Sequence, residues 1–346
     1  MHIMMMTRDV PQTRPGDRRL VATLTATLIA LGASIASLTP FSRAAHATVL
    51  ARPAAVTAGA VTAGAVTAGA GAAISVVDDH GATITLAHTP RRIIALAPSD
   101  AEVLYAVGAG GRVVGVSAAT TYPAAAANKP VVVTTAGPDL ERIVALRPDL
   151  LVAGNIDASY LPKLRTLHLP IMELDPTSVS GVLHDLTITG IVTGHSATAH
   201  TLVASLQARI AAVATRLTGV AARPRVYYEY YYDKTGGYTY GLHSIGDALI
   251  AMAGGDNIGR AGRTAYPTLS AEQIVGAQPQ VIVLGDASSG TTVAAARARP
   301  GFSAIPAVRL GRVYPFDDSI VSSPGPRTVD ALERLARLLH PEAFQR

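Results

Sequence analysis

The chain has 346 residues, of which 49% are hydrophobic, and its formal net charge is +5. This length fits about two domains of roughly 100–200 residues each. The chain contains no cysteine, which excludes disulfides, thiolate metal sites, cysteine nucleophiles and lipid attachment to a cysteine. The positive charge does not indicate a nucleic-acid partner, because no basic run is present and several arginines lie in an N-terminal segment that we expect to be removed.

Residues 1–47 have the pattern of a signal peptide. Arg18 and Arg19 precede an uncharged stretch over residues 20–41, and Ala45 and Ala47 then place small residues at the positions that a signal peptidase needs. We expect cleavage after Ala47 and export by the Sec or the twin-arginine route. The alternative is an uncleaved anchor, because an uncharged stretch of this length is long enough to span a bilayer.

A low-complexity segment, residues 48–72, follows the predicted signal peptide. It contains the pentapeptide Ala-Val-Thr-Ala-Gly in tandem over residues 55–69. Its residues are small and its period of five matches neither a helix nor a strand, so we interpret it as a flexible tether. Folded sequence is expected from residue 73.

Residues 73–194 alternate between strand and helix patterns. Short apolar runs predict strands over residues 82–86, 92–96, 113–116, 131–133 and 150–152. Ser99 with Glu102 has the spacing of a capping box at the start of a helix, and Asp139 is expected to cap a second helix that stops before Pro148. This alternation predicts a parallel sheet covered on both faces.

Two helical patterns follow. One covers residues 178–193 and is broken at Gly194; the other begins at Ser196 and ends near Leu217, with one apolar face. The second would be roughly 30 Å long. We therefore predict a linking helix within residues 195–218.

Residues 219–346 repeat the strand and helix alternation. Strands are predicted over 225–232, 281–284 and 311–314, and helices after Ser244, after Ser270 and over residues 328–339. The repetition extends to sequence, because residues 139–152 align with 270–283 and residues 99–110 align with 244–255. The chain is thus predicted to be an α/β protein with two similarly built lobes, residues 73–194 and 219–346.

Several motifs in order carry a family resemblance. They are LERIVALRPDLLV (140–152), GGDNI (254–258), LSAEQI (269–274), RPGFS (299–303), RVY (312–314) and PGPR (324–327). Together they resemble the helical-backbone periplasmic substrate-binding proteins of ABC importers, the family for ferric siderophores and cobalamin. The resemblance implies two Rossmann-like lobes with parallel-type sheets, joined by one long helix, with the ligand in the cleft between them and little closure on binding.

Glu141 and Glu272 occupy matching positions in the repeated pattern. The resemblance implies that they contact arginines of the membrane permease, one glutamate from each lobe. The alternative is structural, because acidic residues are ordinary in the first turn of a helix, where the helix dipole stabilises them.

Four residues are candidate ligand contacts. Tyr122 matches a family position that faces the cleft, and Tyr238, Tyr240 and His243 lie in a predicted loop at the carboxyl end of a strand, where open α/β sheets bind ligands. Their side chains could stack on a macrocycle or ligate iron or cobalt. The alternative is that these aromatic residues pack in the fold, which is our interpretation for most of the tyrosines between 227 and 232.

These observations predict a secreted, monomeric, non-enzymatic protein that captures a corrinoid or a ferric siderophore and delivers it to an ABC importer permease. We expect no intrinsic cofactor and no resident metal, the cobalt or iron chelate being cargo. Haem is the alternative ligand, and the chain lacks tryptophan, which cobalamin-binding members often use. The alternative of another class is an extracytoplasmic serine hydrolase that uses Ser244 and His243.

Overall fold

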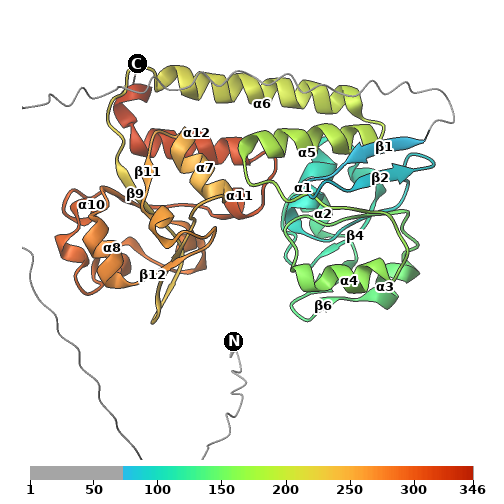
Figure 1. Cartoon of the computed structure of the whole chain (residues 1–346), viewed down its shortest axis with the longest axis horizontal. Helices are drawn as coiled ribbons and strands as arrows, with labels where there is room; N and C mark the ends of the chain where they lie inside the picture. The colour runs from blue at the N-terminus through green and yellow to red at the C-terminus, as the bar shows by residue number, and fades with distance from the viewer. Residues whose placement is uncertain (1–72, 346) are drawn as a thin grey trace, which may run out of the picture. The chain divides into compact units, whose positions relative to one another are not determined.

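The computed structural model describes residues 73–345. The predicted signal peptide and tether, residues 1–72, lie outside the described residues. Within residues 73–345 two α/β lobes are each built on a six-stranded sheet, and a two-stranded hairpin flanks the first sheet (Figure 1).

The N-terminal lobe contains a nearly parallel sheet. Its strand order is β6-β5-β4-β3-β7-β8, and only β6 at the edge is antiparallel to its neighbour. The strands are β3 (Ile93–Ala95), β4 (Val113–Ser117), β5 (Val131–Thr134), β6 (Gly137–Pro138), β7 (Leu150–Val152) and β8 (Ile171–Met172). The antiparallel hairpin consists of β1 (Ile74–Val77) and β2 (Thr83–Leu86).

Helices cover both faces of this sheet. They are α1 (Pro98–Ala106), α2 (Ala124–Ala127), α3 (Leu140–Ala145), α4 (Leu161–Arg165) and α5 (Val179–Val192). Successive strand residues point to opposite faces, so Ile93 packs in one apolar cluster and Ile94 in another, the second shared with Ile143 of α3 and Leu164 of α4. The predicted two-sided parallel sheet is confirmed in this lobe.

The start of α1 differs from the prediction. Pro98 occupies the first helical turn, where its missing N–H leaves no hydrogen bond unmade, and the N-cap is Ala97. The carboxylate of Asp100 accepts a hydrogen bond from the Ala97 N–H at 2.8 Å. The predicted capping box of Ser99 and Glu102 is therefore wrong, and Glu102 is free to contact the other lobe.

The long helix α6 (Ser196–Arg216) connects the lobes as predicted. It lies along α5 of the N-terminal lobe and α12 (Thr328–Leu339) of the C-terminal lobe (Figure 1). Arg209 of α6 pairs with both Asp330 and Glu333 of α12, and its Nε lies 2.9 Å from Glu333. This helix therefore packs on both lobes along its length.

The C-terminal lobe contains a mixed sheet of order β12-β10-β9-β13-β14, with β11 paired to β9. Its strands are β9 (Arg225–Asp233), β10 (Gly236–Thr239), β11 (Asp256–Asn257), β12 (Thr268–Leu269), β13 (Val281–Leu284) and β14 (Val313–Pro315). Its helices, besides α12, are α7 (Ile245–Met252), α8 (Ala271–Ala277), α9 (Val293–Arg297), α10 (Pro306–Arg309) and α11 (Ser319–Ser322). β9, β11, β13 and β14 are parallel, whereas β10 is antiparallel to both of its neighbours, β9 and β12.

The strand β10 corrects the predicted loop that begins at Tyr238. The chain turns back at Gly236, whose φ is +136°, and Tyr238 then pairs with Tyr231 of β9. A Cβ at Gly236 would lie 2.3 Å from the carbonyl oxygen of Leu269, so only glycine fits this close approach. Tyr238 thus lies on a strand, while Tyr240 and His243 follow it in the connection to α7.

The tyrosines of β9 divide between the two faces of the sheet. Tyr227 and Tyr228 are both fully buried, in two different apolar clusters. This confirms the interpretation that these rings pack on both faces. Tyr231 is exposed instead, and Tyr230 borders a cavity.

Candidate ligand-binding site

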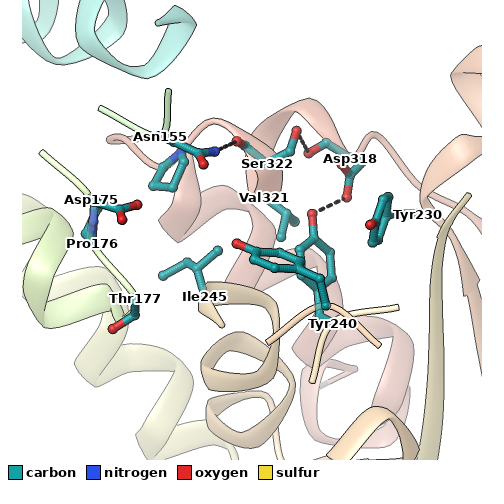
Figure 2. A pocket seen from close by; sticks show the side chains of 12 residues that line it. Asn155, Asp175, Pro176, Thr177, Tyr230, Tyr240, Ile245, Asp318, Val321 and Ser322 are labelled. Atoms are coloured by element: carbon teal, nitrogen blue, oxygen red, sulfur yellow. Dashed lines mark hydrogen bonds between the residues drawn. The ribbon is translucent and has the colours of Figure 1, made fainter. Parts of the chain in front are cut away.

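A cavity of about 190 Å³ lies between the two lobes. The N-terminal lobe lines it with residues that follow β7 and β8, and the C-terminal lobe with residues of β9, α7, α11 and the connections between them (Figure 2). The lining residues are Asn155, Asp175, Pro176, Thr177, Tyr230, Tyr240, Ile245, Tyr266, Asp318, Val321, Ser322 and Pro324. The carboxyl ends of parallel strands are the usual ligand site of open α/β sheets, so the topology explains the position of the N-terminal half.

Three tyrosine rings form the aromatic side of the cavity. The ring centroid of Tyr230 lies 5.4 Å from that of Tyr240 and 6.5 Å from that of Tyr266, and the latter pair is perpendicular. Tyr240 and Tyr266 are 6.0 Å apart. These separations are those of edge-to-face aromatic packing, so the rings support one another and present both faces and edges to the cavity.

Asp318 anchors this aromatic group through hydrogen bonds. Its Oδ1 accepts hydrogen bonds from the hydroxyls of Tyr228 and Tyr240, each at 2.9 Å (Figure 2 shows the latter). Burial raises the pKa of Asp318, and the two phenol donors partly oppose that rise. Burial, together with the charge of Asp318, raises the pKa of Tyr228 and Tyr240 well above the ordinary value, so both phenols act as neutral donors.

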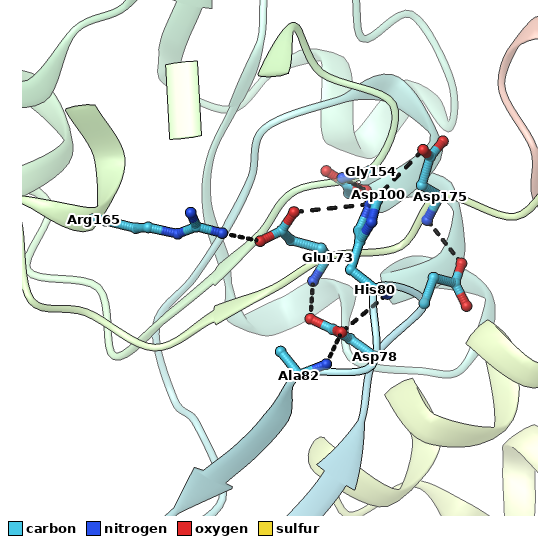
Figure 3. A network of polar contacts seen from close by, with 9 residues as sticks. Asp78, His80, Ala82, Asp100, Gly154, Arg165, Glu173 and Asp175 are labelled. Carbon is cyan, nitrogen blue, oxygen red and sulfur yellow. Dashed lines mark hydrogen bonds and ion pairs between the residues drawn. The ribbon is translucent and has the colours of Figure 1, made fainter. Parts of the chain in front are cut away.

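Two carboxylates, one buried and one partly buried, hold the N-terminal side of the cavity. Asp100 accepts a hydrogen bond from the Gly154 N–H at 2.9 Å, directly before Asn155, and Asp79 accepts one from the Asp175 N–H at 2.8 Å. Figure 3 shows both loops converging on this network. The loops after β7 and β8 are therefore fixed through their backbone, which leaves the side chains of Asn155 and Asp175 for the cavity.

The carboxylates behind these loops are unusually basic. Burial raises the pKa of Asp100 to about 7, although the N–H groups of Gly154 and Ala97 oppose that rise. Burial and the charge of Asp79 raise the pKa of Asp185 to about 9, and burial also raises the pKa of Asp79. This part of the lobe therefore holds protons at neutral pH.

A salt bridge connects the lobes beside the cavity. The Nε and Nη2 atoms of Arg327, just before α12, donate to Oε2 of Glu102 in α1 at 2.8 and 2.6 Å. The guanidinium carbon of Arg327 lies 4.1 Å from the ring centroid of Tyr122. Asn155 adds a second bridge, since its Nδ2 donates to the Ser322 carbonyl oxygen at 3.3 Å.

The four predicted ligand residues occupy different places. Tyr240 lines the cavity. Tyr238 does not line it but packs edge-to-face against Tyr230, with 6.2 Å between ring centroids. Tyr122 is 47% exposed and contacts Arg327. His243 is exposed, has a φ of +67°, and is not among the lining residues.

Sequence reasoning missed most of the lining. Tyr230 was assigned to strand packing, and Asn155, Asp175, Tyr266 and Asp318 were not singled out. The sequence feature that could have identified Asn155 and Asp175 is their position, because each follows a short apolar run that forms a parallel strand. No local pattern distinguishes Asp318, which reaches the cavity through its hydrogen bonds to the tyrosines.

Glu141 and Glu272 are both exposed in the first turns of α3 and α8. Asp139 caps α3 as predicted, and Ser270 with Gln273 forms the capping box of α8. The carboxylate of Glu272 also accepts a hydrogen bond from the Ser270 hydroxyl at 2.7 Å, which lowers the pKa of Glu272. Their proposed contact with a permease stays a prediction.

The Ser244 hydroxyl is used within the fold. It donates to the Gly241 carbonyl oxygen at 2.8 Å and accepts from the Asp247 N–H at 3.2 Å, which caps α7. The Asp247 carboxylate contacts Asn257 and Arg260. No hydrogen bond between Ser244 and His243 is found within residues 73–345.

Residues 73–345 contain neither a clustered metal site nor a membrane-spanning helix. No cluster of three or more histidine, aspartate or glutamate side chains in this part of the chain is arranged to hold a metal ion. No helix in the same part has the length and apolar character needed to cross a membrane.

Comparison with known proteins agrees with this architecture. Residues 93–320 match the family model described as periplasmic binding protein. A cobalamin-binding protein of Halobacterium salinarum is 32% identical over 276 residues, which cover 76% of this chain and 73% of that protein. The vitamin B12-binding protein of Yersinia pestis is 30% identical over 59% of this chain and 72% of its own length.

A solved structure shows the same fold. The periplasmic haem-binding protein RhuT of Roseiflexus superposes with a TM-score of 0.65 and 28% identity, covering 73% of this chain and 99% of the other. These relatives are named as binding proteins, RhuT as a periplasmic one, and the family match over residues 93–320 extends through both lobes. The chain therefore belongs to the periplasmic binding protein family.

Proposed function

We propose that this protein captures a metal chelate outside the cytoplasm and delivers it to the permease of an ABC importer, with a corrinoid as the leading ligand. The observation that carries this proposal is the cavity between the lobes, which both lobes line with aromatic and hydrogen-bonding side chains. Ligand sites commonly combine apolar and aromatic walls with a few placed polar groups. The relatives named for cobalamin and vitamin B12 support the corrinoid.

Haem is the second candidate ligand. Tyr230, Tyr240 and Tyr266 border the cavity, and tyrosine ligates haem iron in some proteins. The similarity to the haem-binding protein RhuT also supports haem as a ligand. Against it, a tyrosine ligand binds iron as phenolate, and burial with nearby carboxylates raises the pKa of Tyr240 and Tyr266.

We further propose how the segments of the chain divide the work. Residues 1–47 act as a cleaved signal peptide, residues 48–72 as a tether, and residues 195–218 as the link between lobes 73–194 and 219–346. The protein acts as a monomer, without enzymatic activity, and Glu141 and Glu272 dock one lobe each on the permease. Their exposure in the first turns of α3 and α8 supports this role.

Tyrosine fluorescence tests the ligand assignment. The chain has 12 tyrosines and no tryptophan, so its emission comes from tyrosine, and an absorbing chelate in the cavity should quench it. We expect cyanocobalamin or haemin to quench the full chain saturably, and Tyr230→Ala to weaken binding at least tenfold. The control Tyr314→Ala, on β14 and not in the cavity lining, should bind as the wild type does. Equal affinities of the two variants would contradict this placement of the ligand.

A further inference from the structure

The charges of the cavity are all of one sign. Asp175 enters from the N-terminal lobe and Asp318 from the C-terminal lobe (Figure 2), and no lysine, arginine or histidine is among the lining residues that the structure describes. Tyr266 lies within the influence of both carboxylates, because its pKa is raised first by burial and then by the charges of Asp175 and Asp318. Two negative charges thus act on the same space from opposite sides.

Basic groups near these elements are already paired. Arg327 donates to Glu102, and Arg165 donates to Glu173 at 2.9 Å. The His80 ring lies 3.8 Å from the carboxylates of both Glu173 and Asp175 (Figure 3). Behind Asp175, the Asp79 carboxylate adds an acidic group that accepts a hydrogen bond from the Asp175 N–H at 2.8 Å.

Both carboxylates border the cavity and can contact a ligand there. The hydroxyls of Tyr228 and Tyr240 donate to the same oxygen of Asp318, Oδ1. The side chain of Asp175 is 48% exposed. The faces of Tyr230 and Tyr266 carry the negative part of the aromatic quadrupole, which attracts cations.

We propose that this cavity selects chelates that carry a positive charge, with Asp175 and Asp318 receiving the cationic group from opposite lobes and the tyrosine rings contacting it. This inference rests on the proposed function and names the ligand class of that same site. Anionic chelates, such as haem with its two propionates, are disfavoured because no lining residue offers them a positive partner. Neutral chelates should bind with an affinity between those of the cationic and the anionic chelates.

Matched chelates that differ in one charge test the proposal. Ferrioxamine B is a ferric trihydroxamate with a pendant ammonium group, and its N-acetyl derivative lacks that charge. Aquocobalamin is cationic and cyanocobalamin is neutral. We expect the cationic member of at least one pair to bind the full chain at least tenfold more tightly at low salt, equivalent to about 1.4 kcal/mol. The difference should shrink as salt is added, because exposed charges are screened.

Substitutions of the two aspartates test whether they cause the preference for cationic chelates. Asp175→Asn should reduce the preference for the cationic chelate at least fivefold, and Asp318→Asn should do the same while keeping an oxygen acceptor for the two tyrosines. The control Asp256→Asn changes an exposed aspartate outside the cavity. It should retain the full preference for the cationic chelate. Because Asp175 is partly exposed, its variant should fold even if the Asp318 variant does not.

The outcomes separate this inference from the proposed function. If chelates bind but the neutral or anionic member binds as tightly as the cationic one, the charge selection is wrong and the binding role stands. If a cationic preference survives in both variants, the assignment to Asp175 and Asp318 is wrong. If no chelate of either pair and no haemin binds, both the inference and the proposed function fail.

Discussion

Glu102 and Arg327 join the two lobes through a salt bridge from α1 to the segment before α12. Glu102 is 3% exposed, and besides the two guanidinium contacts it accepts a hydrogen bond from the Arg327 N–H at 3.2 Å. The ring of Tyr122 covers the guanidinium. This connection, with α6 packed on both lobes, fixes the separation of the lobes and so preforms the cavity.

Removing the charge of Glu102 should destabilise the protein and loosen the lobes. Glu102→Gln leaves Arg327 mostly buried without its carboxylate, and breaking such a pair typically costs about 3 kcal/mol or more. We expect a loss of roughly 2–4 kcal/mol in the free energy of unfolding, allowing for the partial exposure of Arg327. Urea unfolding measures this loss, and small-angle scattering should show a larger radius of gyration.

Arg165→Gln is the matched control for this prediction. Arg165 is 63% exposed and pairs with Glu173 inside one lobe, and His80 lies 3.8 Å from the same carboxylate and remains there in the variant. Its removal should therefore cost less than Glu102→Gln does and leave the radius of gyration unchanged. Equal effects of the two substitutions would show that the bridge between the lobes has no special role.

The buried aspartates should make stability fall as pH rises. The pKa of Asp185 is about 9 in the folded protein and near the ordinary value when unfolded. Between about pH 4 and pH 9 the folded state therefore holds a proton that the unfolded state has released, and stability declines with pH across that window. Asp100, with a pKa of about 7, adds to the decline up to neutral pH.

Asp185→Asn should flatten this profile. The amide keeps the shape of the side chain but does not titrate. The variant should therefore be more stable than the wild type at pH 9, and this advantage should be smaller or absent at pH 5. Thermal unfolding across this range provides the measurement, with Asp256→Asn as an exposed control. A wild-type slope retained in the Asp185 variant would argue against the assignment.

If Glu141 and Glu272 dock on the permease, changing them should prevent chelate uptake without changing chelate affinity. Glu141→Lys combined with Glu272→Lys should abolish chelate uptake by cells while leaving affinity within about twofold, because neither residue lines the cavity. Glu342→Lys, at another exposed glutamate, should support normal uptake. Normal uptake by the double variant would refute the docking role.

Ser244→Ala separates the binding role from the hydrolase alternative. The hydroxyl caps α7, and loss of such a cap typically costs about 1 kcal/mol. We expect that loss in chemical denaturation and no ester hydrolysis by either protein above the buffer rate. Hydrolysis by the wild type that disappears in the variant would support the enzyme instead.

Elements with a strong local pattern were predicted well. β13 (Val281–Leu284) and α12 (Thr328–Leu339) match their predicted ranges, because a short apolar run and an amphipathic stripe ending before Pro341 are set by nearby residues. β10 was missed because Gly236 and Gly237 have no strand pattern. Its position is imposed by pairing with β9, where a Cβ at Gly237 would collide with the Tyr227 hydroxyl.

The site was less predictable than the fold, since it depends on contacts between distant segments. Tyr240 was found because it follows a strand near a helix cap. Asp175 and Asp318 come from different lobes and meet only through the topology, and Glu102 was assigned to a local cap although its partner Arg327 lies in the other lobe. Local spacing carries no information on such pairs.

Calorimetric titration of the full chain with cyanocobalamin, aquocobalamin, haemin and ferric hydroxamates tests the central claim most directly. Capture of a metal chelate predicts saturable one-to-one binding of at least one of them at micromolar affinity or better, about −8 kcal/mol or stronger. No saturable heat with any of these chelates would contradict the claim.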